Sequence, residues 1–441
     1  MVDHIISATW IAPVRPENTV LSDHALAIKQ GKIVALLPLG EALKSWPEAP
    51  YEHLDNHLLT PGFVNTHTHA AMNLFRGMAD DKPLMDWLTN HIWPAESQWM
   101  SPEFVRDGTE LAIAEMQAAG ITCFNDMYFF PNIVAEAAQK AQMRAVVGLI
   151  VLDFPSAWAN TSDEYFDKGL QTHDQVSSYS LVSTAFAPHA PYTVSDKPLI
   201  RALTLADELD IPLHIHIHET AGEIEESNAR YGVRPLERLS QLGLLNPRLL
   251  AVHMTQLLDA EIESLSKQGV NISHCIKSNL KLASGFAPIT KLLNAGANVA
   301  LGTDSVASNN ELDLLSEAKL AALIAKGLSD DAKVVPATQA LEMLTINGAK
   351  ALNLDTVIGS LEVGKSADIV ALDLSGVATQ PVYDPIAQLI YSCSREQVRQ
   401  VWIAGKQVIK DGLHTRIDTS RVLALAKEWA TKITSTNTGN E

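Results

Sequence analysis

Two kinds of apolar periodicity alternate along the middle of the chain. Short apolar runs of strand length are each followed by a stretch in which apolar residues recur every three or four positions, as on one face of a helix. The runs lie at 58–64, 121–127, 145–152, 181–187, 211–218, 249–254, 270–274 and 299–303. Eight strands that alternate with helices in this way predict an α/β fold, a (β/α)8 barrel of the TIM type.

The two ends of the chain have a different pattern. Short β-like runs separated by turn residues occur at 5–11, 25–28 and 33–37, and the same character returns at 359–372, 398–403 and 407–409. We expect these ends to form the two halves of one small β-sandwich domain, with the barrel inserted between them. The expected boundaries are 1–58, 59–355 and 356–441, and the last part also carries a helix at 420–433 and a polar tail.

Charge and composition narrow the class of protein. The 441 residues include 33 lysines and arginines and 51 aspartates and glutamates, which gives a formal net charge of −18 and argues against binding to nucleic acid or to an anionic membrane. The three cysteines form no CxxC pair, so a reducing compartment is expected. We find neither a signal-peptide pattern nor an apolar run of about 18 residues. A cytoplasmic protein is therefore expected, and its oligomeric state, including a homo-oligomer, stays open.

Histidines gather where the predicted strands end. In a barrel of this type the carboxyl ends of all strands meet at one face, so residues far apart in sequence can share a site. The strand-end residues with metal-binding chemistry are His67, His69, His189, His214, His216, His218, Glu219, His253, His274 and Asp304. Taken alone, His67 and His69 could equally be surface histidines. The other histidines and acidic residues at the predicted strand ends favour a metal site.

The fifth predicted strand carries three alternating histidines, and one of them has a distinctive neighbour. Only His216 is followed three residues later by a glutamate, Glu219, which could fold back over the metal as a proton shuttle. We therefore choose His216 as the ligand and expect His214 and His218 to pack around it. Asp304, at the end of the last strand, could be a ligand, a base for water, or both.

The predicted donor set favours one metal ion per subunit. Three neutral imidazoles, one carboxylate and an open position for water suit Zn²⁺, with Fe²⁺ as the alternative. A second metal usually needs a bridging ligand, and the fourth strand has no lysine at its end that could be carboxylated for that purpose. The predicted ligands are His67, His69, His216 and Asp304.

These residues lie in motifs that resemble the amidohydrolase superfamily. The motifs are 61–69 (PGFVNTHTH), His216 with Glu219, His253, 278–285 (SNLKLASG) and 302–304 (GTD). Within the superfamily the chain is similar to the 5-methylthioadenosine/S-adenosylhomocysteine deaminases and to the related triazine hydrolases, over essentially its whole length. The segment 359–372 resembles the part that closes the β-sandwich in relatives.

The resemblance implies roles for individual residues. It implies that the four ligands named above hold the metal, and that Glu96, His189 and Glu219 contact a small nucleoside substrate. In the implied mechanism Asp304 takes a proton from the attacking water, His253 orients that water, and Glu219 protonates the purine ring nitrogen before ammonia leaves. Glu96 would read the ribose hydroxyls.

The expected reaction is the hydrolytic deamination of a 6-aminopurine nucleoside, with 5-methylthioadenosine or S-adenosylhomocysteine as substrate. The nearest alternative is the same machinery acting on guanine, cytosine or a triazine, and Glu96, in the pocket-forming connection 70–99, suits a ribose better than a free base. Cyclic-amide hydrolysis is disfavoured by Glu219 and by the missing bridging lysine. A non-catalytic metal-binding scaffold is a further alternative, which would be expected to have lost part of the site.

Two features of the sequence bear on the tail of the nucleoside substrate, and neither of them determines its identity. Ile276 and Lys277 stand where relatives often carry a proline, which could alter the loop lining the pocket. Among the arginines, Arg144 is only a weak candidate for a contact with the tail. The sequence therefore does not choose between a methylthio and a homocysteine tail.

Overall fold

The structure is a computed structural model that describes residues 2–437. The chain divides into two compact units. One comprises the residues up to Asn65, Met116–Cys123 and Asp313–Arg416, and the other comprises Thr66–Glu115, Phe124–Leu312 and the segment from Ile417 onward.

Eight strands form the predicted barrel sheet, in sequential order. They are β5 (Phe63–Thr68), β6 (Ile121–Asp126), β7 (Arg144–Val151), β8 (Val182–Pro188), β9 (Leu213–Ile217), β10 (Leu249–His253), β11 (Asn271–His274) and β12 (Asn298–Leu301). The backbone N–H groups of Thr303 and Asp304 both donate to the carbonyl oxygen of His67, at 3.1 and 3.0 Å, so the chain beyond β12 returns to β5. Strands buried on both faces explain the continuous apolar runs of the sequence, and the expected (β/α)8 fold is confirmed.

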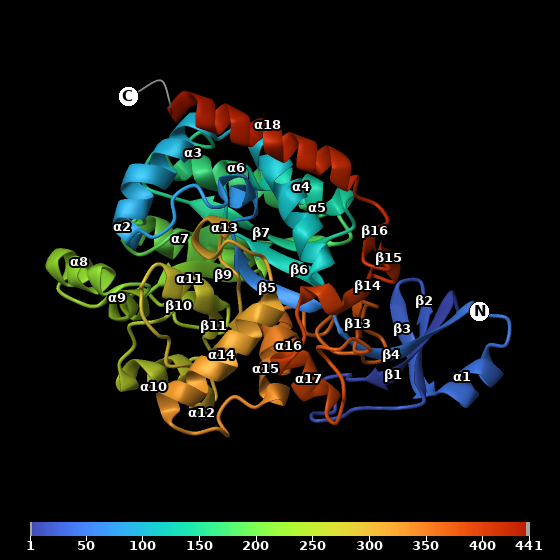
Figure 1. Cartoon of the computed structure of the whole chain (residues 1–441). Helices are drawn as coiled ribbons and strands as arrows, with labels where there is room; N and C mark the ends of the chain where they lie inside the picture. The colour runs from blue at the N-terminus through green and yellow to red at the C-terminus, as the bar shows by residue number, and fades with distance from the viewer. Residues whose placement is uncertain (1, 438–441) are drawn as a thin grey trace. The chain divides into compact units, whose positions relative to one another are not determined.

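Helices follow the barrel strands, as Figure 1 shows. They are α4 (Pro102–Ala118), α5 (Pro131–Lys140), α6 (Ser162–Val176), α7 (Asp196–Leu209), α8 (Ala221–Tyr231), α9 (Pro235–Gln241), α10 (Asp259–Lys267), α11 (Ile276–Lys281), α12 (Ile289–Asn294) and α13 (Val306–Asn309). Threonine side chains cap two of them: Thr161 accepts from the N–H of Glu164 at the start of α6, and Thr220 accepts from the N–H of Glu223 at the start of α8.

The long connection after β5 is helical. It runs through η1 (Ala70–Phe75), α2 (Leu84–Trp87), one π-helical turn η2 (Leu88–Ile92) and α3 (Trp93–Trp99). Each piece is too short to show a helical period in the sequence, and for this reason the segment reads only as a long connection. Its buried side chains include Trp87, Leu88 and Ile92.

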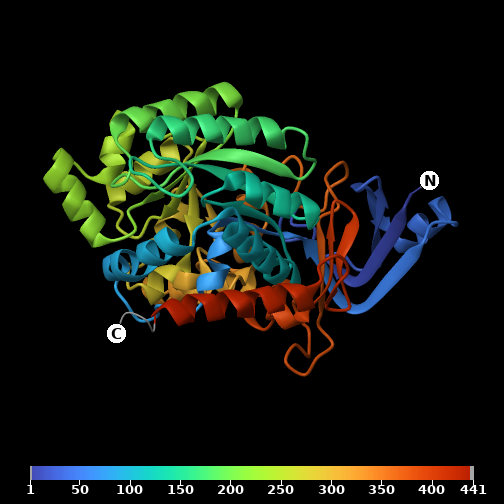
Figure 2. The same cartoon turned by 90° about the horizontal axis from the view of Figure 1, so that it is seen from above.

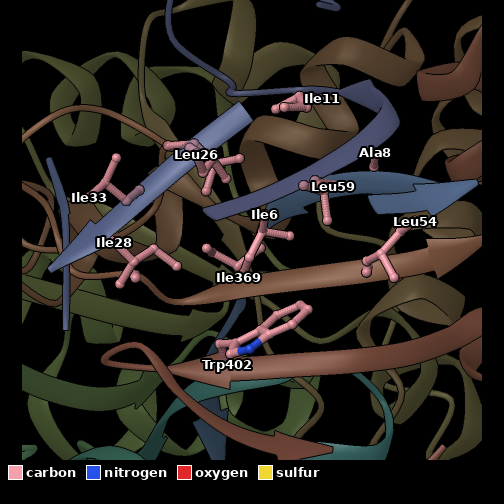
Figure 3. Close-up of a cluster of buried hydrophobic side chains, with 13 residues drawn as sticks. Ile6, Ala8, Ile11, Leu26, Ile28, Ile33, Leu54, Leu59, Ile369 and Trp402 are labelled. Carbon is pink, nitrogen blue, oxygen red and sulfur yellow. The ribbon is translucent and has the colours of Figure 1, made fainter. Parts of the chain in front are cut away.

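A second eight-stranded sheet draws on both ends of the chain, in the order β16-β15-β14-β13-β4-β1-β2-β3. Its strands are β1 (His4–Ile11), β2 (His24–Lys29), β3 (Lys32–Pro38), β4 (Tyr51–Pro61), β13 (Ile369–Asp373), β14 (Val398–Ile403), β15 (Lys406–Lys410) and β16 (Leu413–His414). Side chains from well-separated strands, such as Ile28 and Trp402, share one buried cluster, so the sheet curves over its own core (Figure 3).

The apolar run 58–64 is two strands rather than one. β4 ends at Pro61 in the second sheet, and β5 begins at Phe63 in the barrel sheet. Between them the N–H of Gly62 donates to the carbonyl oxygen of Asp368 at 2.9 Å. A Cβ atom at Gly62 would lie 2.0 Å from the hydroxyl oxygen of Thr122, so only glycine fits at this crossing.

Six further helical elements follow the barrel or flank the second sheet: α1 (Leu39–Ser45), α14 (Leu314–Ser329), α15 (Ala337–Leu344), α16 (Ile346–Ala351), α17 (Pro385–Tyr391) and the short η3 (Arg395–Gln397). Thr345, whose φ and ψ are −130° and −90°, separates α15 from α16.

The last helix, α18 (Thr419–Asn437), is longer than expected and packs on α4. Figure 2 shows it in red along the outside of the barrel helices. The Trp429 ring lies edge-on to Phe104 at 5.3 Å, and its Nε1–H donates to Asp107 at 2.8 Å. Across the described residues, we find no helix with the length and apolar character that a membrane span requires.

Candidate metal centre and active site

The four predicted metal ligands converge at the carboxyl ends of the barrel strands. His67 lies in β5, His69 follows it, His216 lies in β9, and Asp304 follows β12. The Nε2 atoms of His67 and His69 each lie 3.3 Å from Oδ1 of Asp304. The Nε2 atoms of His67 and His216 lie 3.2 Å apart. Four side chains from three distant parts of the sequence thus point their donor atoms at one place.

Hydrogen bonds on the far side of each ring set this orientation. Nδ1 of His69 donates to the carbonyl oxygen of Met127 at 2.5 Å, and Nδ1 of His216 donates to that of His189 at 2.7 Å. In a neutral imidazole whose Nδ1 carries the proton, Nε2 presents a lone pair. Nε2 atoms 3.2 Å apart repel each other unless a proton or a cation lies between them. The arrangement therefore fits a metal ion.

The protonation states also suit a divalent cation. Burial lowers the pKa of His67 to about 4, and burial with the neighbouring His67 holds the pKa of His216 well below its ordinary value. Burial alone would raise the pKa of Asp304, but hydrogen bonds from His67 and His69 hold it well below the usual range. For His69, Asp304 outweighs burial and raises the pKa, and a cation would take the place of that proton. Imidazoles with an ionised carboxylate are donors that Zn²⁺ accepts.

Asp304 is held in place by its neighbours. Its Oδ2 accepts from the hydroxyl of Ser278 at 2.6 Å and from that of Ser308 at 3.2 Å, while its Oδ1 accepts from the N–H of Ser305 at 2.7 Å. Ser278 lies on α11 and Ser308 on α13. With Oδ2 occupied, Oδ1 is the oxygen that faces His67 and His69.

Glu219 and His253 lie beside the predicted ligands. Nε2 of His253 lies 3.8 Å from Oε2 of Glu219, and Nδ1 of His253 lies 2.9 Å from Oδ1 of Asn279 on α11. Nitrogens of His67, His216 and His253 also lie close enough together to hold a metal ion, so His253 is a candidate fifth donor. Burial raises the pKa of Glu219, which favours a protonated carboxyl able to donate.

Several strand ends are in an unusual backbone conformation. His218, His253 and Asp304 have φ angles of 54°, 75° and 59°, in the left-handed region that residues other than glycine rarely adopt. Such strain concentrates at functional sites, where the surrounding structure compensates for it.

Comparison with known proteins decides the family. Residues 58–408 match the model of the Amidohydrolase family. This chain belongs to the amidohydrolase family. The resemblance that the motifs indicate is therefore confirmed.

Relatives of this amidohydrolase cover nearly the whole chain. A protein named 5-methylthioadenosine/S-adenosylhomocysteine deaminase from Teredinibacter turnerae is 46% identical over 98% of both chains, and one from Thermodesulfovibrio yellowstonii is 43% identical over 97% of this chain and 98% of that protein. The crystal structure of an adenosine deaminase from Xanthomonas campestris with bound zinc is 48% identical, with a TM-score of 0.96 over 98% of this chain and 99% of that one.

The amidohydrolase site opens into a cavity of about 660 Å³. His69, His189, His216, Glu219, His253 and Asp304 line it together with Glu96 and apolar residues. Glu96 lies on α3, where its Oε1 accepts a hydrogen bond of 2.8 Å from the hydroxyl of Tyr128, and burial raises the pKa of Glu96 to about 7. Burial also lowers the pKa of His189 to about 3.

The remaining strand-end histidines have other surroundings. Nε2 of His214 lies 2.9 Å from Nδ1 of His67, and Nδ1 of His214 lies 3.1 Å from the amide nitrogen of Asn125. Nε2 of His218 accepts from the backbone N–H of Leu236 at 3.1 Å. His214 therefore packs against the predicted ligand His67, whereas the side chain of His218 contacts α9 and the expectation that it packs around the ligands stays a prediction. His274 is buried and does not line the cavity.

Sequence reasoning missed three residues that shape the amidohydrolase site. They are Tyr128, Asn279 and Glu223. Oε1 and Oε2 of Glu223 accept from the N–H groups of His218 and Glu219 at 3.1 and 2.7 Å, and burial raises the pKa of Glu223 to about 8. Its sequence signal is a capping-box pattern, Thr220 followed three residues later by glutamate. Asn279 lies in the motif 278–285 (SNLKLASG), which carries the family resemblance but gives no role for this residue, and Tyr128 carries no comparable signal.

Ile276 and Lys277 lie on α11. Ile276 is buried, and Lys277 forms an ion pair with Glu311. Arg144 is the first residue of β7, at the opposite end of that strand from the cavity.

Proposed function

We propose that this amidohydrolase deaminates 6-aminopurine nucleosides, 5-methylthioadenosine and S-adenosylhomocysteine among them, to the inosine derivative and ammonia. The observation that carries the proposal is the position of Glu219. Its carboxyl, with a pKa raised by burial, lies 3.8 Å from His253 at the wall of the cavity that the candidate metal ligands also line. The names of relatives that are 46% and 43% identical support the same reaction.

We infer that His67, His69, His216 and Asp304 hold one Zn²⁺, with Fe²⁺ as the alternative. Zinc in the structure of the Xanthomonas campestris relative supports this assignment. The metal, when bound, supplies the Lewis acidity that makes water a nucleophile at neutral pH.

Asp304 and His253 would prepare the attacking water. Oδ1 of Asp304 faces the centre and can accept a proton, because Oδ2 is occupied by Ser278 and Ser308. Nδ1–H of His253 donates to Asn279, which leaves Nε2 to accept a hydrogen bond from the water and to orient it. The water oxygen then adds to C6 of the purine.

Glu219 would supply the proton that the ring needs. As the oxygen adds to C6, the carboxyl of Glu219 donates its proton to N1, so that negative charge does not build up on the ring. Collapse of the tetrahedral carbon breaks the bond between C6 and the amino nitrogen. The nitrogen leaves as ammonia with the proton that Asp304 took from the water. The proton left on the C6 hydroxyl passes to the ionised Glu219, which forms the C6 carbonyl of the inosine derivative and restores the protonated carboxyl.

Glu96 would recognise the ribose. Tyr128 occupies one side of Oε1, and the remaining lone pairs of the carboxylate can accept from two vicinal hydroxyls. A free base such as guanine or a triazine has no such hydroxyls, so Glu96 favours a nucleoside over these alternatives. A neutral His189 can hydrogen-bond a ring nitrogen from the other side of the cavity.

The test is an ammonia-release assay combined with the absorbance change from an adenine to a hypoxanthine chromophore. The panel is 5-methylthioadenosine, S-adenosylhomocysteine, adenosine, guanine and cytosine, with metal-loaded protein. We expect turnover of the adenosine derivatives and none of the free bases. Failure to turn over any adenosine derivative, with metal bound, would rule the proposal out.

A further inference from the structure

The cavity wall beyond the candidate metal centre is apolar. Apolar lining residues come from the helical segment after β5, with Leu88, Ile92 and Trp93, and from the end of β7 and the residues that follow it, with Ile150, Leu152 and Phe154. Phe154 is 42% exposed, so it lies at the rim of the cavity. A ligand group that reaches these residues meets hydrocarbon.

Among the residues that the structure describes, those that line the cavity include three carboxyl groups, those of Glu96, Glu219 and Asp304, but neither lysine nor arginine. An anionic group of a ligand that lies away from the candidate metal centre would therefore find hydrocarbon, and no lysine or arginine among the described lining residues.

Two lysines on neighbouring segments are already paired. Lys168 on α6 forms an ion pair of 2.7 Å with Glu164 and bonds to the carbonyl oxygen of Trp158. Lys281 on α11 forms an ion pair of 2.5 Å with Asp80. Arg144 begins β7, an eight-residue strand, and at about 3.3 Å per residue it lies roughly 23 Å from the end that lines the cavity.

The chemistry of a nucleoside fixes where its 5′ substituent lies. C6 and C5′ are at opposite ends of an adenosine, so with C6 at the metal centre and the ribose on Glu96, the 5′ substituent points at the apolar wall. A methylthio group there is buried among hydrocarbon, which is favourable. The α-carboxylate and the α-ammonium group of a homocysteine tail would both lose water there without gaining a charged partner from the apolar residues.

We propose that this enzyme selects 6-aminopurine nucleosides with an uncharged 5′ substituent and discriminates against an amino-acid tail. The inference rests on the proposed function, because it concerns the same cavity with C6 at the metal centre. Stranding a desolvated carboxylate beside an apolar wall lowers kcat/KM for S-adenosylhomocysteine about 100-fold or more relative to 5-methylthioadenosine.

The test separates charge from length. We compare kcat/KM for 5-methylthioadenosine, adenosine, S-adenosylhomocysteine and 5′-butylthioadenosine, whose tail is neutral and about as long as homocysteine. The butylthio compound should stay within about tenfold of the methylthio compound, because both tails are apolar. A value for S-adenosylhomocysteine within tenfold of methylthioadenosine overturns the inference and leaves the proposed function standing. Equally poor turnover of both long tails points to size and overturns it as well.

A pair of variants tests the wall directly. Phe154→Arg places a cation at the rim, and Phe154→Gln is the matched neutral control. The arginine should raise the ratio of kcat/KM for S-adenosylhomocysteine to that for methylthioadenosine about tenfold or more, with the gain shrinking at high salt, and glutamine should not. If Phe154→Arg folds, by circular dichroism and Tm, but leaves the ratio unchanged, the tail does not lie against this wall. Absence of turnover of every nucleoside would instead refute the proposed function, and the inference with it.

Discussion

Replacing Tyr128 by phenylalanine removes one hydroxyl group, and we expect this change to act through the carboxyl group of Glu96. The hydroxyl donates to Oε1 of Glu96 at 2.8 Å and so favours the ionised form of that carboxyl, whose pKa burial raises to about 7. A hydrogen bond to a charged group contributes about 1.5–3 kcal/mol. At about 1.4 kcal/mol per pH unit, its loss should raise the pKa of Glu96 by about 1 to 2 pH units.

The expected result is that the acid limb in the pH profile of kcat/KM moves to higher pH. Ionised Glu96 accepts ribose hydroxyls more strongly than the neutral acid does, so kcat/KM should rise as pH rises through about 7 in the wild type. In Tyr128→Phe the ionised fraction at pH 7 falls from about half to about 1–10%, which lowers kcat/KM roughly 5- to 50-fold at that pH. Activity should recover as the pH is raised further.

The assay is kcat/KM for 5-methylthioadenosine against pH. Tyr192→Phe is the control, because Tyr192 lines the same cavity and contacts His189 rather than Glu96. Acid limbs that coincide in wild type and Tyr128→Phe would show that Glu96 does not bind the substrate as an ionised group that Tyr128 supports.

Three further variants test other parts of the site. Glu219→Gln should lower kcat about 10²- to 10⁴-fold while metal content by mass spectrometry stays unchanged, and full activity would exclude the proton shuttle. His214→Ala removes the ring 2.9 Å from Nδ1 of His67 and should weaken zinc binding about 10- to 100-fold in a chelator competition; unchanged affinity would make His214 a packing residue only. Glu223→Ala leaves two buried N–H groups without an acceptor and should lower the free energy of unfolding of the metal-loaded protein in urea by about 2–5 kcal/mol. A decrease below about 0.5 kcal/mol would contradict this prediction.

The barrel could be predicted because its strands are buried on both faces, which leaves continuous apolar runs. Other elements lack such a signal. The buried face of α6 contains Gly169 and Thr172, so its apolar period is weak. The run 58–64 is apolar on both sides of Gly62, and periodicity does not reveal that the chain passes there from one sheet to another.

The ligand cluster could be predicted for a different reason: in this fold, side chains at the carboxyl ends of the strands meet at one shared face. That position is not sufficient, since His274 ends β11 and is still outside the cavity lining. Tyr128 and Asn279 act through contacts with Glu96 and His253, 32 and 26 residues away. Such pairs depend on how loops and helices fold over the barrel, which spacing does not encode. The roles of the ligands and of the substrate contacts stay predictions.

The most direct test of the central claim, metal-dependent deamination at this cluster, is chelation followed by reconstitution with 5-methylthioadenosine as substrate. Protein stripped of metal should release no ammonia, and addition of Zn²⁺ should restore release of one ammonia per nucleoside consumed, with binding of one Zn²⁺ per chain. Ammonia release that persists in fully stripped protein, or zinc-loaded protein that leaves the nucleoside intact, would contradict the account.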